Sequence, residues 1–308
     1  MLVTGAGGFI GSAVTRALVQ RDVSVSALLG PPGAAVVPPP EGSAHALAEI
    51  DDLPELVRLA SDAEVIIHIA GPPSVAASFS NPAEYARVHV VGTATVLEAC
   101  RQVDARRLVY ISSAEVYGQP KINPVTENFL TSPRSPYGAA KLGGEAYVET
   151  CARAFGFEAV ILRPFSVYGP GGSERSVLGT IWRQALHGCE IKIQDPRPVR
   201  DYCFIDDLVE AIWLSCIRPQ SDQVRTYNIG TGVGTSVGQL IEHILEILHL
   251  DLPVQVASQT DRPAGTDILE LISDSTRALD ELGWRAETSL KKGLKRTIEF
   301  LEANSNLS

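Results

Sequence analysis

Short, almost uninterrupted apolar runs alternate with longer stretches of helical periodicity through the first half of this 308-residue chain. The apolar runs have the length and composition of strands buried on both faces: Met1–Thr4, Val23–Leu29, Glu64–Ile69, Arg107–Ser112 and Glu158–Arg163. Helical patterns lie between them, at Gly8–Gln20, Asp52–Ala60, Pro82–Arg101 and Pro136–Phe155. Strand–helix alternation of this kind predicts a doubly wound parallel sheet with helices on both faces.

The pattern changes near Pro164. Glycine turns and shorter strands follow, with helical patterns near Ser176–His187, Ser236–Leu248 and Leu290–Leu301. We therefore expect an α/β fold with a Rossmann-type sheet domain over residues 1–165, to which the chain returns around residues 204–232. Residues 166–203 and 233–308 are then expected to form a smaller C-terminal α/β lobe that binds the substrate.

Composition and charge narrow the functional classes. Apolar residues make up 45% and charged residues 20% of the chain, which suits a soluble protein with a substantial core. The net charge of −10 argues against a nucleic-acid partner, and no apolar run is long enough for a membrane span. No signal peptide is visible, and five widely spaced cysteines without a CxxC pair favour reduced thiols in a cytoplasm. We expect no metal site.

A glycine-rich turn follows the first apolar run, in "LVTGAGGFIGS". Gly5, Gly8 and Gly11 have the spacing TGxxGxxG, in which the first permits a tight turn and the second lets a phosphate approach the backbone. The third lets the next helix pack against the strand, and the start of that helix adds N–H donors and partial positive charge. Because the turn lies between a strand and a helix, it indicates a dinucleotide-binding site.

One expected part of a dinucleotide site is missing. An acid at the end of the second strand usually binds the adenosine ribose, but Leu29 stands there, ahead of the Pro/Gly-rich irregular loop Gly30–Gly42. No Arg or Lys follows nearby to favour a 2′-phosphate, so we expect NAD rather than NADP. Glu49 is a candidate for reaching the adenine from the next loop, and a solvated loop acid fits its spacing equally well.

The stretch "SPYGAAKLGGE" places Tyr137 and Lys141 four residues apart, on one face of a predicted helix. A phenol titrates near pH 10, so it needs a lowered pKa to act as a base at neutral pH, and a neighbouring ammonium or a nicotinamide cation lowers it. Lys141 is also a candidate for holding the cofactor ribose. Ser112 and Ser113 end the preceding strand, where a hydroxyl can orient a substrate toward Tyr137. Tyr-x-x-x-Lys alone is usually a surface pair. The serines and the upstream glycine turn are what favour a catalytic role for this one.

These motifs together resemble the extended branch of the short-chain dehydrogenase/reductase superfamily, the NAD-dependent nucleotide-sugar epimerases and dehydratases similar to UDP-glucose 4-epimerase. The resemblance extends over nearly the whole chain and rests on "VTGAGGFIGS", "VIIHIAG", "VVGTATVLEAC", "SSAEVYG", "SPYGAAK", "RPFSVYGPG", "RDYCFIDDLVEAI", "YNIGTG" and "LGW". It implies that Ser113, Tyr137 and Lys141 are catalytic. It also implies a homodimer formed through Pro82–Arg101 and Pro136–Phe155.

The resemblance implies an epimerase, most simply a 4-epimerase. In the family a hydride passes from a sugar carbon, usually C4, to bound NAD, while Tyr137 would take the hydroxyl proton with Ser113. The resulting keto sugar receives the hydride back on its other face. A non-catalytic dinucleotide sensor is the alternative of another class, and the retained Ser113, Tyr137 and Lys141 disfavour it.

Because of Glu115, a dehydratase or a decarboxylase remains an alternative to the epimerase. The 4,6-dehydratases of the family carry an adjacent Asp–Glu pair where this chain has Ala114 and Glu115. The usual acid is therefore absent and the usual base remains. Glu115 fits equally a structural acid that caps the backbone or pairs with an arginine.

The resemblance also implies contacts with the cofactor and with a nucleotide-diphosphate sugar. Cofactor contacts are expected from Gly5, Gly8, Phe9, Ile10, Gly11, Glu49, Ile50, Ala70, Tyr137 and Lys141. Substrate contacts are expected from Ser113, Ser166, Arg200 and Arg262, of which the arginines suit the diphosphate. Ser166 and His89 both stand where the family usually has Asn, so the sequence does not specify the sugar.

Overall fold

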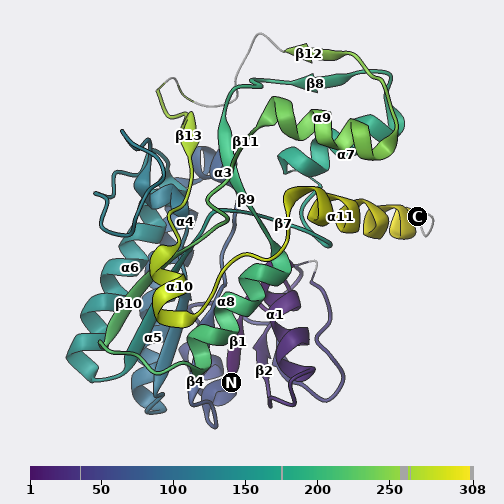
Figure 1. Cartoon of the computed structure of the whole chain (residues 1–308). Coiled ribbons are helices and arrows are strands. Elements are labelled where there is room, and N and C mark those ends of the chain that lie inside the picture. Colours follow the sequence, from purple (N-terminus) through teal and green to yellow (C-terminus); the bar gives the residue numbers. More distant parts are fainter. Residues whose placement is uncertain (35, 175, 257–262, 264, 306–308) are drawn as a thin grey trace.

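A seven-stranded parallel sheet forms the centre of the molecule (Figure 1). The computed structural model describes residues 1–34, 36–174, 176–256, 263 and 265–305. The strands lie in the order β10-β6-β5-β4-β1-β2-β3, and every neighbouring pair is parallel. Their bounds are β1 Leu2–Thr4, β2 Ser26–Leu28, β3 Ala44–Ala46, β4 Val65–His68, β5 Arg107–Ile111, β6 Glu158–Pro164 and β10 Val224–Ile229. The predicted α/β fold with a doubly wound parallel sheet is confirmed.

Helices cover both faces of this sheet, because successive strand residues point into two separate apolar cores. Val3 packs in the core that also holds residues of α1 and α8, and Leu2 packs in the core of α2, α5 and α6. The helices of this domain are α1 Phe9–Val19, α2 Leu53–Ala60, α3 Val75–Ser80, α4 Pro82–Ala86, α5 Gly92–Gln102, α6 Pro136–Phe155 and α8 Ile205–Ile217. Since all strands are parallel, the loops that follow β1, β4, β5 and β6 meet at one edge of the sheet.

The first half differs from its predicted elements in several places, one of which is the unpredicted helix α3. β2 covers only the last part of the predicted strand, since its register with β1 begins at Ser26. β3 was not predicted, because it is a short, largely exposed edge strand without an apolar run. The predicted helix Pro82–Arg101 is interrupted by a π-helical turn, η1, at Arg87–Val91. Such a turn holds one extra residue, which the apolar periodicity does not reveal.

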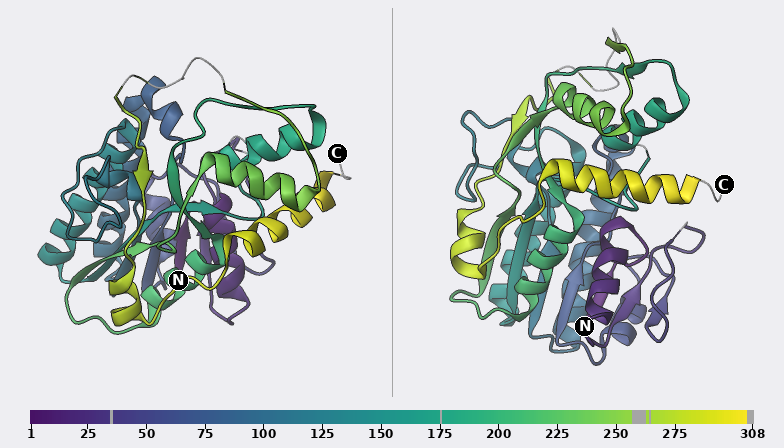
Figure 2. Two further views of the ribbon diagram at one scale, coloured as in Figure 1. Left: turned by 45° about the horizontal axis from the view of Figure 1, so that its top comes forward. Right: turned by 45° about the vertical axis from the view of Figure 1, so that its right-hand side comes forward.

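The second half adds a smaller lobe above the carboxyl edge of the sheet (Figure 2). Its strand β9 pairs with β7 and β13 in parallel and with β11 antiparallel, while β8 and β12 form a separate pair. The bounds are β7 Ser166–Tyr168, β8 Ile191–Ile193, β9 Val199–Phe204, β11 Gly234–Ser236, β12 Val254–Val256, β13 Glu270–Leu271, α7 Val177–His187, α9 Val237–Leu248, α10 Thr276–Leu282 and α11 Leu290–Ser305. Helices α7, α9 and α11 confirm the three predicted ones. Helix α10 packs back onto β10 and α8.

Helix α6 carries the Tyr–Lys pair and has well-defined ends. The Ser135 hydroxyl caps its start by accepting a hydrogen bond from the Gly138 N–H at 3.1 Å, and Pro136 occupies the first turn. Gly156 ends the helix in the left-handed conformation, at a φ of 87°. Although α6 has 20 residues, neither it nor any other described helix is long and apolar enough to cross a membrane.

Candidate active site

The glycine turn after β1 forms a cradle in which side chains have no room. Gly5 has a φ of 70°, and a Cβ there would lie 2.7 Å from the Ala70 Cα. A Cβ on Gly11 would collide with the Gly5 carbonyl oxygen, so α1 packs directly on the turn. Gly8 is exposed and precedes the first turn of α1, whose N–H groups have no partner within the helix. This geometry fits the diphosphate of a dinucleotide.

The end of β5 brings two serines and Glu115 to the same edge of the sheet. Ser112 and Ser113 follow Ile111 and lead into the 3-10 turn η2, Ala114–Tyr117. The Ser113 Oγ accepts a hydrogen bond from the Glu115 N–H at 3.2 Å, so its own proton is free to be donated elsewhere. The Ser113 side chain also faces the Tyr137 hydroxyl closely enough to lower the pKa of that phenol. The structure therefore brings the predicted serine and tyrosine together.

The Tyr137 ring lies edge-on to two other rings. Its centroid is 5.5 Å from that of His89 and 6.2 Å from that of Tyr85, with interplanar angles of 80° and 86°. Burial raises the pKa of Tyr137 to about 12, the hydrogen bond with Ser113 opposes this, and the charge of Glu115 adds to it. The phenol in this arrangement is therefore protonated at neutral pH.

Lys141 follows Tyr137 by one helical turn, and its amine binds a backbone carbonyl of β5. Its Nζ donates to the Ile111 carbonyl at 2.7 Å and lies 5.2 Å from the centroid of the Tyr110 ring. Burial lowers the pKa of Lys141 to about 7, against the charge of Glu145. The expectation that the Lys141 ammonium lowers the pKa of Tyr137 therefore stays a prediction.

His89, in η1, has a buried acceptor atom without a partner. Its Nε2 lies 3.1 Å from the Pro72 carbonyl oxygen, which assigns the proton to Nε2 and leaves Nδ1 as an acceptor. Nδ1 has no hydrogen-bond partner among the described residues, and burial lowers the pKa of His89 to about 2. The ring fills the space beside Gly71, where any Cβ would collide with it. A ribose hydroxyl would satisfy such an atom, so His89 together with the glycine cradle fits a bound dinucleotide.

A buried ion pair behind the serines holds α6 against the sheet. Arg163, at the end of β6, binds the Glu145 carboxylate of α6 through two hydrogen bonds of 2.9 and 2.6 Å. Ser112 donates to the same carboxylate at 2.5 Å. The relative exposures of Arg163 and Glu145 are only 7% and 2%. The pair therefore ties the residue next to Ser113 to the helix that carries Tyr137.

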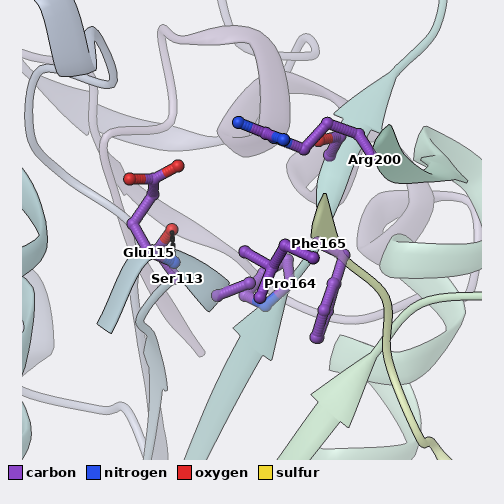
Figure 3. A pocket seen from close by; sticks show the side chains of 8 residues that line it. Ser113, Glu115, Pro164, Phe165 and Arg200 are labelled. Atoms are coloured by element: carbon purple, nitrogen blue, oxygen red, sulfur yellow. Dashed lines mark hydrogen bonds between the residues drawn. The ribbon is translucent and has the colours of Figure 1, made fainter. Parts of the chain in front are cut away.

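A hollow opens beside Ser113, between the sheet and the smaller lobe (Figure 3). It is lined by Ser113, Ala114, Glu115, Pro164, Phe165, Ser166, Arg200 and Leu271. Figure 3 shows the Glu115 and Arg200 side chains reaching toward the opening from opposite sides. Of the four predicted substrate contacts, Ser113, Ser166 and Arg200 share this hollow, while Arg262 lies outside the described residues.

The remaining predicted cofactor contacts surround the glycine turn. Phe9 and Ile10 begin α1, and Ala70 packs against Gly5. Ile50 is buried. Glu49 is exposed and forms an ion pair with Arg87 at 3.2 Å, so its contact with an adenine stays a prediction.

Sequence reasoning missed several buried polar residues of the site. Glu145 follows Lys141 by four residues on α6, and that spacing was the signal available. His68, at the end of β4, bridges Thr4 at 2.8 Å and Thr93 at 3.0 Å. Burial lowers the pKa of His68 to about 3, so the ring is neutral. No local pattern pointed to His68, because its partners lie on other elements.

Sequence and structure comparisons with known proteins agree with this geometry. The statistical model of the NAD dependent epimerase/dehydratase family matches residues 1–230. A putative UDP-glucose 4-epimerase of Methanocaldococcus jannaschii is 32% identical over 312 residues, which cover 99% of each chain. The crystal structure of UDP-glucose 4-epimerase from Thermotoga maritima with UDP-glucose has a TM-score of 0.90 and 31% identity, covering 100% of this chain and 99% of that one. The Thermus thermophilus UDP-glucose 4-epimerase in complex with NAD has a TM-score of 0.88 and 26% identity, covering 98% of each chain.

Proposed function

The chain belongs to the NAD dependent epimerase/dehydratase family, and on that premise we propose that it is an NAD-dependent nucleotide-sugar epimerase, most simply a 4-epimerase of a UDP-sugar. The observation that carries the proposal is the juxtaposition of the Ser113 side chain and the Tyr137 hydroxyl. It lies at the carboxyl edge of the sheet, beside the hollow and with Lys141 one turn along α6. This assembly also disfavours a non-catalytic sensor.

In the proposed reaction the chain's own residues handle the proton and the orientation of the sugar. Bound NAD would supply a reversible hydride acceptor for the sugar carbon. Tyr137 takes the proton of the sugar hydroxyl, and Ser113 holds that hydroxyl in line with the phenol oxygen. Lys141 binds the cofactor ribose, and its amine adds positive charge when it is protonated.

We propose that the smaller lobe, formed by residues 166–203 and 233–308, binds the nucleotide part of the substrate. Arg200 on β9 and Ser166 on β7 reach the same hollow as Ser113, which supports this division. A guanidinium pairs well with the oxygens of a diphosphate. Arg200 is therefore assigned to the diphosphate and Ser166 to the sugar.

The product mass tests the proposed activity most directly. The purified protein is incubated with a panel of UDP-, dTDP-, GDP- and CDP-sugars, and the products are analysed by mass spectrometry and NMR. An epimerase gives an unchanged mass with new proton couplings at one sugar carbon. Loss of water or of carbon dioxide from every active sugar would overturn the epimerase in favour of a lyase, and no product from any sugar would contradict both.

Glu115 supports the second candidate, a dehydratase or decarboxylase, because it lines the hollow next to Ser113. In an epimerase we expect Glu115→Gln to change kcat by less than about tenfold, since the carboxylate takes no proton from the substrate. In a dehydratase or decarboxylase the same change removes a base and lowers kcat by about a hundredfold or more. Steady-state rates of the two proteins on the same sugar distinguish these outcomes.

We also propose a homodimer formed through the helices of residues 82–102 and α6. Val91, Tyr147 and Phe155 support it, because these large side chains are 52%, 47% and 50% exposed on that side of the sheet domain. Packing two copies through these helices would remove apolar surface from water. Sedimentation velocity checks the proposal, and a monomer at micromolar concentrations would contradict it.

A cytoplasmic role in carbohydrate metabolism is proposed on the same premise. All five cysteines are free thiols, which fits a reducing compartment. Fractionation of cells that produce the protein checks the location.

A further inference from the structure

The segment after β2 folds back over the glycine turn and encloses Gly7. The Gly7 N–H donates to the Leu29 carbonyl at 3.0 Å, and the Gly7 carbonyl accepts from the Val37 N–H at 2.9 Å. The Val36 side chain lies directly on Gly7, since a Cβ added there would be 2.6 Å from the Val36 Cβ. The glycine turn is therefore joined directly to the end of β2, and Val36 covers the junction.

Leu29 leaves the end of β2 without a polar side chain. It is only 6% exposed and packs in the apolar core with Val25 and Ala27. Gly30 follows and has no side chain, but a Cβ there would lie 3.7 Å from the Val36 Cγ1. Val36 is half-buried, so it occupies the edge where dinucleotide sites usually carry the carboxylate that binds the adenosine ribose.

Among the residues that the structure describes, no free Lys or Arg lies at this edge to bind a phosphate. The sequence has no Lys or Arg between Asp22 and Val57. Arg87 reaches toward this part of the chain from η1, but it is bound to Glu49 at 3.2 Å and to Asp51 at 2.7 Å. It also pairs with Glu84 at 2.8 Å. An additional phosphate would therefore meet an apolar side chain and carboxylates.

We propose that Val36 is the wall against which the adenosine ribose of bound NAD lies, and that this wall excludes NADP. A 2′-phosphate placed against it would lose water without gaining a cation, which is unfavourable. This chain then selects NAD over NADP by the cost of desolvating the 2′-phosphate, and not by a carboxylate that binds the 2′-hydroxyl. The inference rests on NAD as the cofactor and is independent of the identity of the sugar.

Binding of cofactor analogues to the wild-type protein is the first test. Isothermal titration of the full chain, stripped of cofactor, uses NAD⁺, NADP⁺ and NAD⁺ lacking the 2′-hydroxyl of the adenosine ribose. We expect NADP⁺ to bind about a hundredfold or more weakly than NAD⁺, and the deoxy analogue to bind within about threefold of NAD⁺. A hydrogen bond between a carboxylate and the 2′-hydroxyl would make the deoxy analogue about tenfold weaker or worse, and that result overturns the proposal. Equal affinity for NADP⁺ and NAD⁺ overturns it as well.

Val36→Arg and its neighbour Val37→Arg provide a matched pair of variants. Val36→Arg places a guanidinium at the proposed ribose edge and should tighten NADP⁺ by about thirtyfold at low salt, with a smaller gain at high salt. Val37 is 41% exposed and contacts the turn through its backbone N–H, so Val37→Arg should change NADP⁺ affinity by less than about threefold. Equal gains in the two variants would show a general charge effect and overturn the placement of Val36. The titration involves no sugar, so a failure of the proposed epimerase activity leaves its outcome unchanged.

Discussion

Replacing Tyr137 with Phe is expected to lower kcat by about a thousandfold while cofactor binding is retained. The change removes the oxygen that faces Ser113 and that would accept the sugar proton. It leaves the ring, and with it the edge-on contacts to His89 and Tyr85. Steady-state kinetics on the sugar found active in the panel measure the loss, and titration with NAD⁺ verifies that the cofactor still binds.

Tyr85→Phe is the matched control for this prediction. It removes a phenolic oxygen from the same ring cluster, but that oxygen donates to the Ser74 carbonyl at 2.7 Å and does not bond to Ser113. We expect it to lower kcat by less than about tenfold. The wild-type rate should also rise with pH, because a base must be deprotonated to act and burial raises the pKa of Tyr137 to about 12. A Tyr137→Phe variant with near wild-type kcat and the same pH profile would assign the base to another residue.

The central sheet could be predicted from the sequence because its strands are buried on both faces. The run Val65–Ile67 of β4 is apolar for this reason, and the pattern is then visible without knowledge of its neighbours. β3 is the opposite case, since its residues are mostly exposed and it is a strand only because β2 offers a free edge. The π-helical turn at Arg87–Val91 is also invisible locally, because the helix before and after it keeps its apolar face.

The candidate site shows the same division between local and long-range information. A spacing of four residues predicts that Tyr137 and Lys141 lie one turn apart on the same helix, and both residues do lie on α6. Where the Lys141 amine binds depends on the Ile111 carbonyl of another element, which the spacing on one helix does not reveal. The role of Val36 likewise arises from a loop that folds back on a glycine, which no motif records.

Replacing Arg163 with Met is expected to lower the free energy of unfolding by about 3–5 kcal/mol. The change removes two short hydrogen bonds of 2.9 and 2.6 Å. Among the described residues it leaves the buried Glu145 carboxylate with only the Ser112 hydroxyl as a hydrogen-bond partner. It also removes the donor to the Tyr117 hydroxyl at 2.9 Å. Urea unfolding, followed by circular dichroism and by fluorescence, measures the difference.

Two further variants distinguish the effect of an unpaired buried charge on stability from the effect of the lost contacts. In the double variant Arg163→Met with Glu145→Leu no unpaired charge remains, so we expect it to recover more than half of the loss. Arg58→Met removes an equally bidentate pair, with Glu55 at 2.8 and 2.6 Å, but that pair lies on the surface of α2. The surface variant should cost much less stability, because water solvates the carboxylate that is left. Equal losses for Arg163→Met and Arg58→Met would show that burial of the Glu145 charge does not govern the stability of this site. If the double variant recovers stability but not kcat, the ion pair serves to position Ser113 and Tyr137.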